Sequence, residues 1–367
     1  MMLRMKLWLE RIFNRRKRLL AVWDEHLKKG EIVVEVKDQG NKKEDTAAER
    51  WISYRPEIKV LDCTIRDGGL MNNHLFTDEV VKAVYEANVQ AGVDYMEFGY
   101  KGSENVFSRG EFGAWKFCKE EDIRKIVGDN DTSLKISVMA DTGRTDYDDI
   151  LPKNESVVDL IRVATYIHQI PAAIELLNVA VDKGYETCIN IMAISTAPEH
   201  ELDEALELLA KTPVDCIYVV DSFGSFYSEQ IIYYMDKYLS YAKPVGKELG
   251  MHAHNNQQLA YANTIETVIK GANYLDASMA GLGRGAGNCA MELLLGFLHN
   301  PKYKMRPILQ CIQEYIEPMR AKLMWGPDIP YMITGQMNQH PREAIQFNAS
   351  KDRGNIVKFF DMMNEED

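Results

Sequence analysis

The sequence predicts an α/β protein built as a (β/α)8 TIM barrel, with an N-terminal helical extension and a small C-terminal helical appendage. Eight short runs rich in Val, Ile and aromatic residues alternate with segments of helical periodicity. This alternation is typical of a parallel sheet, and eight units over residues 58–300 match the size of a barrel. A doubly wound sheet is the alternative, but it would need a glycine-rich turn after its first strand, where this chain has Arg66-Asp67-Gly68-Gly69.

The expected elements follow one another in regular order. The strands are expected at 58–65, 93–100, 134–141, 160–166, 187–195, 215–222, 249–255 and 274–281. The clearest helical segments are 78–91, 172–183, 201–211, 229–241 and 259–270. Several of them end beside a glycine, a common helix stop.

Two segments flank the predicted barrel. Residues 1–57 combine a basic amphipathic helix with a polar linker, and charged residues interrupt any secretory apolar core. We interpret this helix as packed on the protein itself or on a sister subunit, with a membrane surface or another partner as the alternative. Residues 301–367 are expected to form the helical appendage, with a helix over 305–324 kinked before Pro318 and a last helix over 355–363.

Composition narrows the class of protein. The 367 residues carry a net charge of −12, which argues against nucleic acid as a partner because phosphate binding needs clustered cations. The sequence has no run of about 18 apolar residues, so no transmembrane helix is expected. The 6 cysteines form no CxxC pair, as expected of reduced thiols in a cytoplasmic protein.

Polar residues gather at the C-terminal ends of the expected strands, where barrels of this type place their active sites. His252 and His254 are two residues apart on one strand, so both imidazoles point to the same face. With Asp67 they would form a facial triad for Mg, Mn, Zn or Co, and Asn288 would add an oxygen ligand. The alternative is a pair of histidines that bond to neighbouring backbone groups.

Arg66 would hold a carboxylate or stabilise an enolate oxygen, unless it only forms a structural ion pair with Glu97 or Asp221. Glu97, Thr165 and Asp221 are expected to bind substrate or to orient the groups that do. A Schiff-base mechanism needs a lysine inside the barrel, and only Lys101 lies near a strand end.

Several motifs resemble one known family. LDCTIRDGG at 61–69 is similar to the TLRDG signature of the metal-dependent HMG-CoA lyase-like barrels, a superfamily of metallolyases that also includes isopropylmalate and homocitrate synthases. Segments 160–166, 216–226, 250–265 and 275–295 resemble 4-hydroxy-2-oxovalerate aldolases most closely. The resemblance covers roughly residues 58–300.

The resemblance implies a divalent metal, Mn or Mg before Zn or Co, held by Asp67, His252 and His254. It implies a lyase that cleaves or forms a C–C bond in a 4-hydroxy-2-oxo acid through a metal-bound pyruvate-type enolate, which Arg66 would stabilise. A small 2-oxo acid would be the substrate, the chain would be a homodimer, and a dehydrogenase would take the aldehyde product.

The chain also departs from the family pattern. Leu70 stands where these aldolases have their catalytic histidine, and His74 in the same loop is expected to replace it or to be an ordinary loop histidine. Tyr331 is expected to be the substrate-side tyrosine. Gly69 stands where acyl-CoA-dependent synthases have Glu, and Cys289 lies outside the GLGRGAG loop. A Claisen-type enzyme and a catalytically weakened scaffold barrel remain the alternatives.

Overall fold

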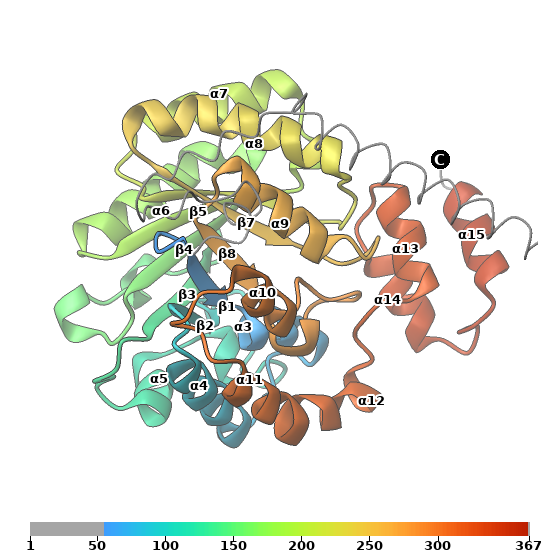
Figure 1. Cartoon of the computed structure of the whole chain (residues 1–367), viewed down its shortest axis with the longest axis horizontal. Coiled ribbons are helices and arrows are strands. Elements are labelled where there is room, and N and C mark those ends of the chain that lie inside the picture. The colour runs from blue at the N-terminus through green and yellow to red at the C-terminus, as the bar shows by residue number, and fades with distance from the viewer. Residues whose placement is uncertain (1–54, 366–367) are drawn as a thin grey trace, which may run out of the picture. The chain divides into compact units, whose positions relative to one another are not determined.

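The computed structural model describes residues 55–365, so the helix and linker predicted for residues 1–57 lie almost wholly outside the described part. Eight parallel strands close into a barrel in chain order, with helices outside it (Figure 1). The closing pair is β1 with β8, in which Leu61 lies opposite Asp276. The predicted TIM barrel is confirmed.

The strands agree with the expected runs to within a few residues at most ends. They are β1 (Lys59–Asp62), β2 (Tyr95–Tyr100), β3 (Lys135–Asp141), β4 (Leu160–Tyr166), β5 (Glu186–Met192), β6 (Cys216–Asp221), β7 (Glu248–Ala253) and β8 (Tyr274–Ala277). The largest difference is β8, which ends at Ala277 because a 3-10 turn begins at Met279.

The outer layer consists of α4 (Asp78–Ala91), α5 (Glu120–Val127), α6 (Ile170–Asp182), α7 (Glu199–Ala210), α8 (Ser228–Ala242), α9 (Ala260–Lys270) and α10 (Met291–Leu298). α4 shows why these segments are helical: the Thr77 hydroxyl accepts from the Val80 amide at its start, and Gly92 ends it at φ 73°. Between β3 and β4 the chain forms only two 3-10 turns, at Tyr147–Asp149 and Lys153–Glu155.

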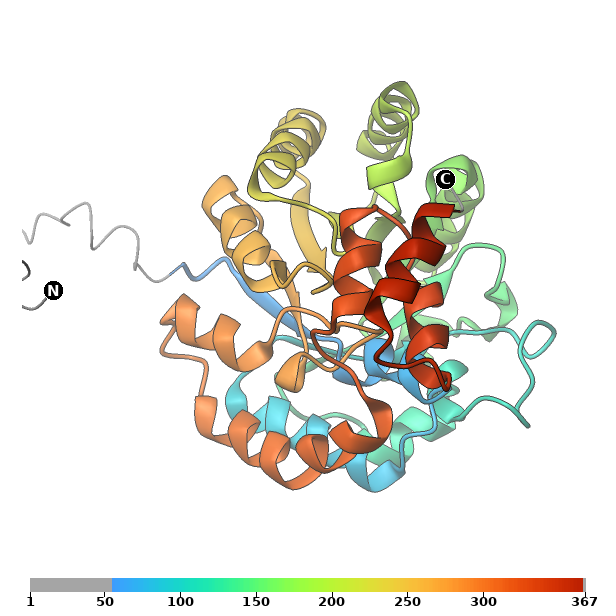
Figure 2. The same ribbon diagram turned by 90° about the vertical axis from the view of Figure 1, so that its right-hand side faces the viewer.

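The C-terminal region has two parts. α11 (Met305–Cys311) packs on α4 and continues through a π turn and a 3-10 turn, Glu317–Met319, into α12 (Arg320–Leu323). The expected break before Pro318 therefore lies at this change of helix type. α13 (Ile329–Gln336), α14 (Arg342–Ala349) and α15 (Ile356–Glu365) form a cluster of their own across one end of the barrel (Figure 2). No helix in residues 55–365 is long and apolar enough to cross a membrane.

The barrel interior is filled at the N-terminal ends of the strands. Tyr95, Tyr218 and Tyr274, which we call the tyrosine layer, are buried there with Leu61 and small side chains. The hydroxyls of Tyr95 and Tyr274 donate to Glu186 at 2.7 and 2.8 Å. Open space within the barrel is therefore confined to the opposite, C-terminal ends.

Candidate active site and metal centre

A short helix positions the first candidate ligand. Arg66 and Asp67 lie in α3 (Thr64–Gly68), a short helix directly after β1, where the sequence predicts a turn. The Asp62 carboxylate holds the start of this helix, because it accepts from the Thr64 amide and from Asn88 Nδ2, both at 2.6 Å. This contact turns the chain at the mouth of the barrel.

The three predicted metal ligands come together. His252 lies in β7 and His254 follows that strand, and their ring centroids are 5.0 Å apart. One ligand atom from each of Asp67, His252 and His254 lies within 4.8 Å of the others. The three residues are buried. Two histidines and a carboxylate are a donor set that suits a divalent transition metal and leaves sites for substrate.

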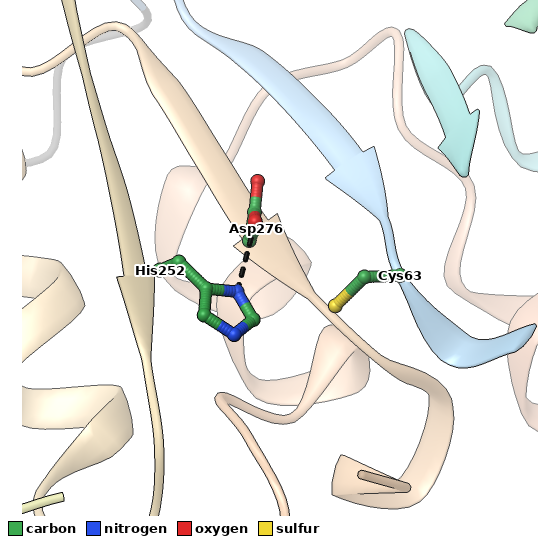
Figure 3. Close-up of side chains that lie close together, drawn as sticks. All are labelled: Cys63, His252 and Asp276. Atoms are coloured by element: carbon green, nitrogen blue, oxygen red, sulfur yellow. Dashed lines mark hydrogen bonds and ion pairs between the residues drawn. The ribbon is translucent and has the colours of Figure 1, made fainter. Parts of the chain in front are cut away.

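Unpaired atoms support this arrangement. His252 Nε2, His254 Nδ1 and Asn288 Oδ1 are buried without a hydrogen-bond partner, which is costly unless a ligand satisfies them. His252 Nδ1 lies 2.9 Å from the Asp276 carboxylate, which fixes its proton there and frees Nε2 (Figure 3). Asn288 donates Nδ2 to the Cys63 sulfur at 3.7 Å, so its oxygen is free. The residues present fit a divalent cation.

A second group of ligand-type atoms lies beside the first. Cys63, His252 and Asp276 also approach one another (Figure 3). Burial raises the pKa of the Cys63 thiol well above its ordinary value, so the metal-binding thiolate is disfavoured. Asp276 is already bonded to Arg162 and His252. The Asp67 group is therefore the better metal site.

Buried ion pairs connect the two sides of this site. We call the connected residues the charge chain; they are Asp67, Arg66, Glu97, Arg162, Asp276 and His252. Arg66 bonds to Asp67 at 2.7 Å and to Glu97 at 2.6 Å. Arg162 bonds to Glu97 at 2.9 Å and to Asp276 at 2.6 Å. Each carboxylate in the chain therefore faces a guanidinium, as burial requires.

The charge chain sets the ionisation of the ligands. Burial opposes ionisation of Asp67, but Arg66 and the two histidines hold the pKa of its carboxyl well below the usual range. Burial and the nearby Arg284 hold the pKa of His254 well below 6.5. Carboxylate and neutral imidazole are the forms that bind metal, so the site is ready for a cation at neutral pH.

A small cavity opens above these ligands. Its wall consists of Arg66, Asp67, Leu70, Tyr100, Met139, Ala164, Asn190, Met192, Val220, Ser222, His252, His254 and Arg284. The register of β2 is irregular between Glu97 and Tyr100. Glu97 forms a hydrogen bond with Arg66, and Tyr100 lines the cavity. The cavity therefore brings charged, polar and apolar side chains together beside the metal-ligand residues.

The model of the HMGL-like family matches residues 57–314, which include the whole barrel. The chain belongs to the HMGL-like family. A 4-hydroxy-2-oxovalerate aldolase from Rhodococcus jostii (strain RHA1) is 32% identical over 243 residues, which are 65% of this chain and 70% of that protein. The family predicted from the motifs is therefore confirmed. The predicted enzyme class, a carbon–carbon lyase, is confirmed as well.

Solved structures agree with this membership of the HMGL-like family. The N-terminal domain of a proposed aldolase from Bacteroides vulgatus superposes with a TM-score of 0.69 at 27% identity, over 82% of this chain and 100% of that chain. HMG-CoA lyase from Brucella melitensis gives a TM-score of 0.58 at 17% identity, over 72% of this chain and 99% of that chain. The second likeness supports the fold alone.

The three residues expected to bind substrate lie behind the cavity wall of this HMGL-like barrel. Glu97 joins the two arginines of the charge chain. The Thr165 hydroxyl donates to the Tyr166 carbonyl. Asp221 accepts from the Ser225 and Phe226 amides, and burial raises the pKa of its carboxyl to about 7. Their geometry supports the orienting interpretation over direct contact with substrate.

The two further residues expected in catalysis are also set back from the cavity. His74 is buried at φ 60°, with its ring against Tyr100 at 5.4 Å between centroids. Burial lowers its pKa to about 3. Tyr331 is buried among the C-terminal helices, where its ring contacts Gly285. Neither residue is part of the cavity wall, so both catalytic roles remain predictions.

Two residues of the site were missed by sequence reasoning. Asp276 orients His252, and the signal was a carboxylate inside an otherwise apolar strand. Arg284 lines the cavity and holds Asp67 through its backbone amide at 3.3 Å. Its signal was a single long side chain in the GLGRGAG loop.

Proposed function

We propose that this chain is a divalent-metal-dependent aldolase that cleaves or forms a C–C bond in a 4-hydroxy-2-oxo acid through a pyruvate-type enolate. The observation that carries the proposal is the convergence of Asp67, His252 and His254 around unpaired buried atoms. The family relatives named as aldolases support the reaction class.

The side chains suggest how the reaction would proceed. A bound divalent cation would act as a Lewis acid toward the 2-oxo group. Arg66 lines the cavity and is held rigidly by Asp67 and Glu97, so it would donate hydrogen bonds to the oxygen on which negative charge develops. The apolar wall formed by Met139, Ala164 and Met192 would keep water from that charge.

We propose His74 as the base that removes the proton of the 4-hydroxyl group. Its imidazole is neutral at physiological pH, because burial lowers its pKa to about 3. A base with so low a pKa is weak, so the proposed role requires a less buried position of the ring during the reaction. Its Nδ1 has no hydrogen-bond partner. Tyr100 contacts the His74 ring and also lines the cavity, so it lies between His74 and the substrate. His74 would therefore act through Tyr100 or after a loop movement.

The acyl-CoA alternative has less support. Cys289 is fully buried and lies outside the cavity wall, and burial raises the pKa of its thiol to about 12. Such a thiol is poorly suited to the reactive role of the glutaryl-CoA lyases. We therefore favour an aldehyde over an acyl thioester as the second substrate.

Exchange of the pyruvate methyl protons with deuterium tests the proposal without any aldehyde. The full chain with Mn²⁺ should catalyse this exchange, and chelation should stop it. His252→Ala should lose both Mn²⁺ binding and exchange, whereas His200→Ala, an exposed histidine on α7, should change neither. Exchange that survives chelation and His252→Ala would contradict the proposal. Tight Mn²⁺ binding without exchange would favour a scaffold barrel.

Other properties extend the proposal. Mn or Mg is the proposed metal, ahead of Zn or Co, from the family resemblance; the carboxylate, amide and imidazole donors accommodate all four. All six cysteines lie in the described region, free and buried, which supports a cytoplasmic location. A homodimer, and a dehydrogenase that takes the aldehyde product, are proposed from the family resemblance.

A further inference from the structure

Arg284 is the unusual cation of the cavity. It comes from the loop after β8, and its guanidinium reaches the carbonyl oxygen of Ser222, after β6, at 2.6 Å. It therefore crosses the mouth of the barrel above the ligand group. Arg66, the other guanidinium in the cavity wall, is already paired with two carboxylates.

No carboxylate of residues 55–365 accepts a hydrogen bond from the Arg284 guanidinium, although Asp67 lies nearby and accepts from the Arg284 backbone amide. Among residues 55–365 the side-chain partners of Arg284 are the Ser222 carbonyl and His340 Nε2, at 2.6 and 3.0 Å. Its Nε is buried without a partner. A guanidinium has five N–H donors, so at least three are left for a ligand, one of them the buried Nε.

Both ring nitrogens of His340 face N–H donors, so the imidazole cannot satisfy both of them. His340 Nε2 would have to accept from Arg284, while its Nδ1 would have to accept from the Arg342 amide at 3.0 Å. Burial lowers the pKa of His340 to about 4, and a neutral imidazole has only one acceptor nitrogen. One of the two bonds is therefore lost, so His340 does not saturate Arg284.

The position of Arg284 defines which part of a substrate it would meet. The proposed reaction places the 2-oxo group at Asp67, His252 and His254, deep in the cavity. Arg284 bridges toward Ser222 and toward His340, in the loop between α13 and α14. The group that reaches it is the far end of the substrate, which becomes the aldehyde after cleavage.

We propose that Arg284 binds a carboxylate on the aldehyde half, so that the substrate is a 4-hydroxy-2-oxo dicarboxylic acid. This inference rests on the proposed aldolase function and deepens it. A guanidinium pairs with a carboxylate through parallel hydrogen bonds, and Arg284 lines the same cavity as Arg66 and the three metal-ligand residues. The acceptor in the condensing direction is then an aldehyde acid.

Matched aldehydes test the inference in the condensing direction with pyruvate and Mn²⁺. Succinic semialdehyde and glyoxylate carry the carboxylate, butanal and acetaldehyde lack it, and glycolaldehyde phosphate tests a phosphate instead. The kcat/KM for the carboxylated aldehydes should exceed that for the neutral ones by about 10- to 100-fold, the usual effect of hydrogen bonds to a charged group.

Variants assign the preference to Arg284. Arg284→Met should raise KM for the carboxylated aldehydes and remove most of the preference, and Arg284→Lys should restore part of it. Arg306→Met, an exposed arginine on α11 bonded only to Gln310 among the described residues, should behave as wild type. Pyruvate exchange, measured in parallel, reports on the metal site without any aldehyde.

Four outcomes would overturn the inference. Exchange without a preference for carboxylated aldehydes would reject it and leave the aldolase function standing. A preference for the phosphate would reject the carboxylate. An equal loss of exchange and of every aldehyde reaction in Arg284→Met would place Arg284 on the 2-oxo acid instead. Absence of exchange in wild type would reject the aldolase function and this inference with it.

Discussion

Asp276→Asn is the most informative single change in the charge chain. The Asp276 oxygen Oδ2 accepts from both Arg162, at 2.6 Å, and His252, at 2.9 Å, whereas Oδ1 has no partner. An asparagine can place its carbonyl oxygen at Oδ2 and its amide at Oδ1. The substitution therefore removes one negative charge and keeps both hydrogen bonds.

The expected magnitude follows from the charges. The charge chain contains three carboxylates, Asp67, Glu97 and Asp276, and two guanidiniums, Arg66 and Arg162, so its net charge before metal binding is −1. Asp276→Asn makes this 0 and lowers the basicity of His252. Loss of such a supporting carboxylate typically weakens metal binding about 10- to 100-fold, or about 1.4–2.7 kcal/mol.

Titration of Mn²⁺ into the purified full chain, followed by electron paramagnetic resonance, measures this loss. Circular dichroism checks that the variant is folded. Glu186→Gln is the matched control, because it removes a carboxylate from the same barrel at the tyrosine layer, away from the ligands. Mn²⁺ affinity in Asp276→Asn within two-fold of wild type would refute the reasoning, as would an equal loss in Glu186→Gln.

Three further predictions concern the loop after β1 and the appendage. Burial raises the pKa of Asp62 from 3.8 to about 6, so its contribution to stability is complete below pH 3.8 and is lost as pH rises through 6. Between pH 4 and 7, Asp62→Asn, with the Asn88 amide flipped to bond it, should gain about 2 kcal/mol of unfolding free energy relative to wild type in urea titrations; a constant difference would contradict this. Gly69→Ala should displace the His74 ring, which fills the Cβ position, and lower the unfolding free energy by about 1–3 kcal/mol; unchanged stability would show that the ring moves freely. Tyr331→Phe should keep kcat within about two-fold, since its ring lies outside the cavity wall; a folded variant with a ten-fold loss would place the hydroxyl in the reaction.

The barrel could be predicted because its strands are buried on both faces. β4 coincides with the expected run 160–166, since most of its residues favour strands and all but the last are buried. The segment between β3 and β4 offered no helical periodicity and forms only 3-10 turns. α5 was not predicted, because eight residues carry little periodic signal. Packing on the barrel rather than local pattern determines such short helices.

The site was predictable only where local geometry decides it. His252 and His254 share a face because strand periodicity is two. Asp67 reaches them through the short helix α3, which the sequence did not reveal. The pairing of Asp276 with Arg162 and the contact of Arg284 with His340 join residues 114 and 56 positions apart. These contacts depend on barrel closure and on packing of the appendage, and no sequence period encodes them.

The tyrosine layer also has a kinetic consequence. Because it fills the barrel at the N-terminal ends of the strands, substrate and both products share one entrance at the mouth. The aldehyde half lies nearer that entrance in the proposed reaction, so it must depart before the 2-oxo acid beneath it. Release is then ordered, and in the reverse direction the 2-oxo acid must enter first.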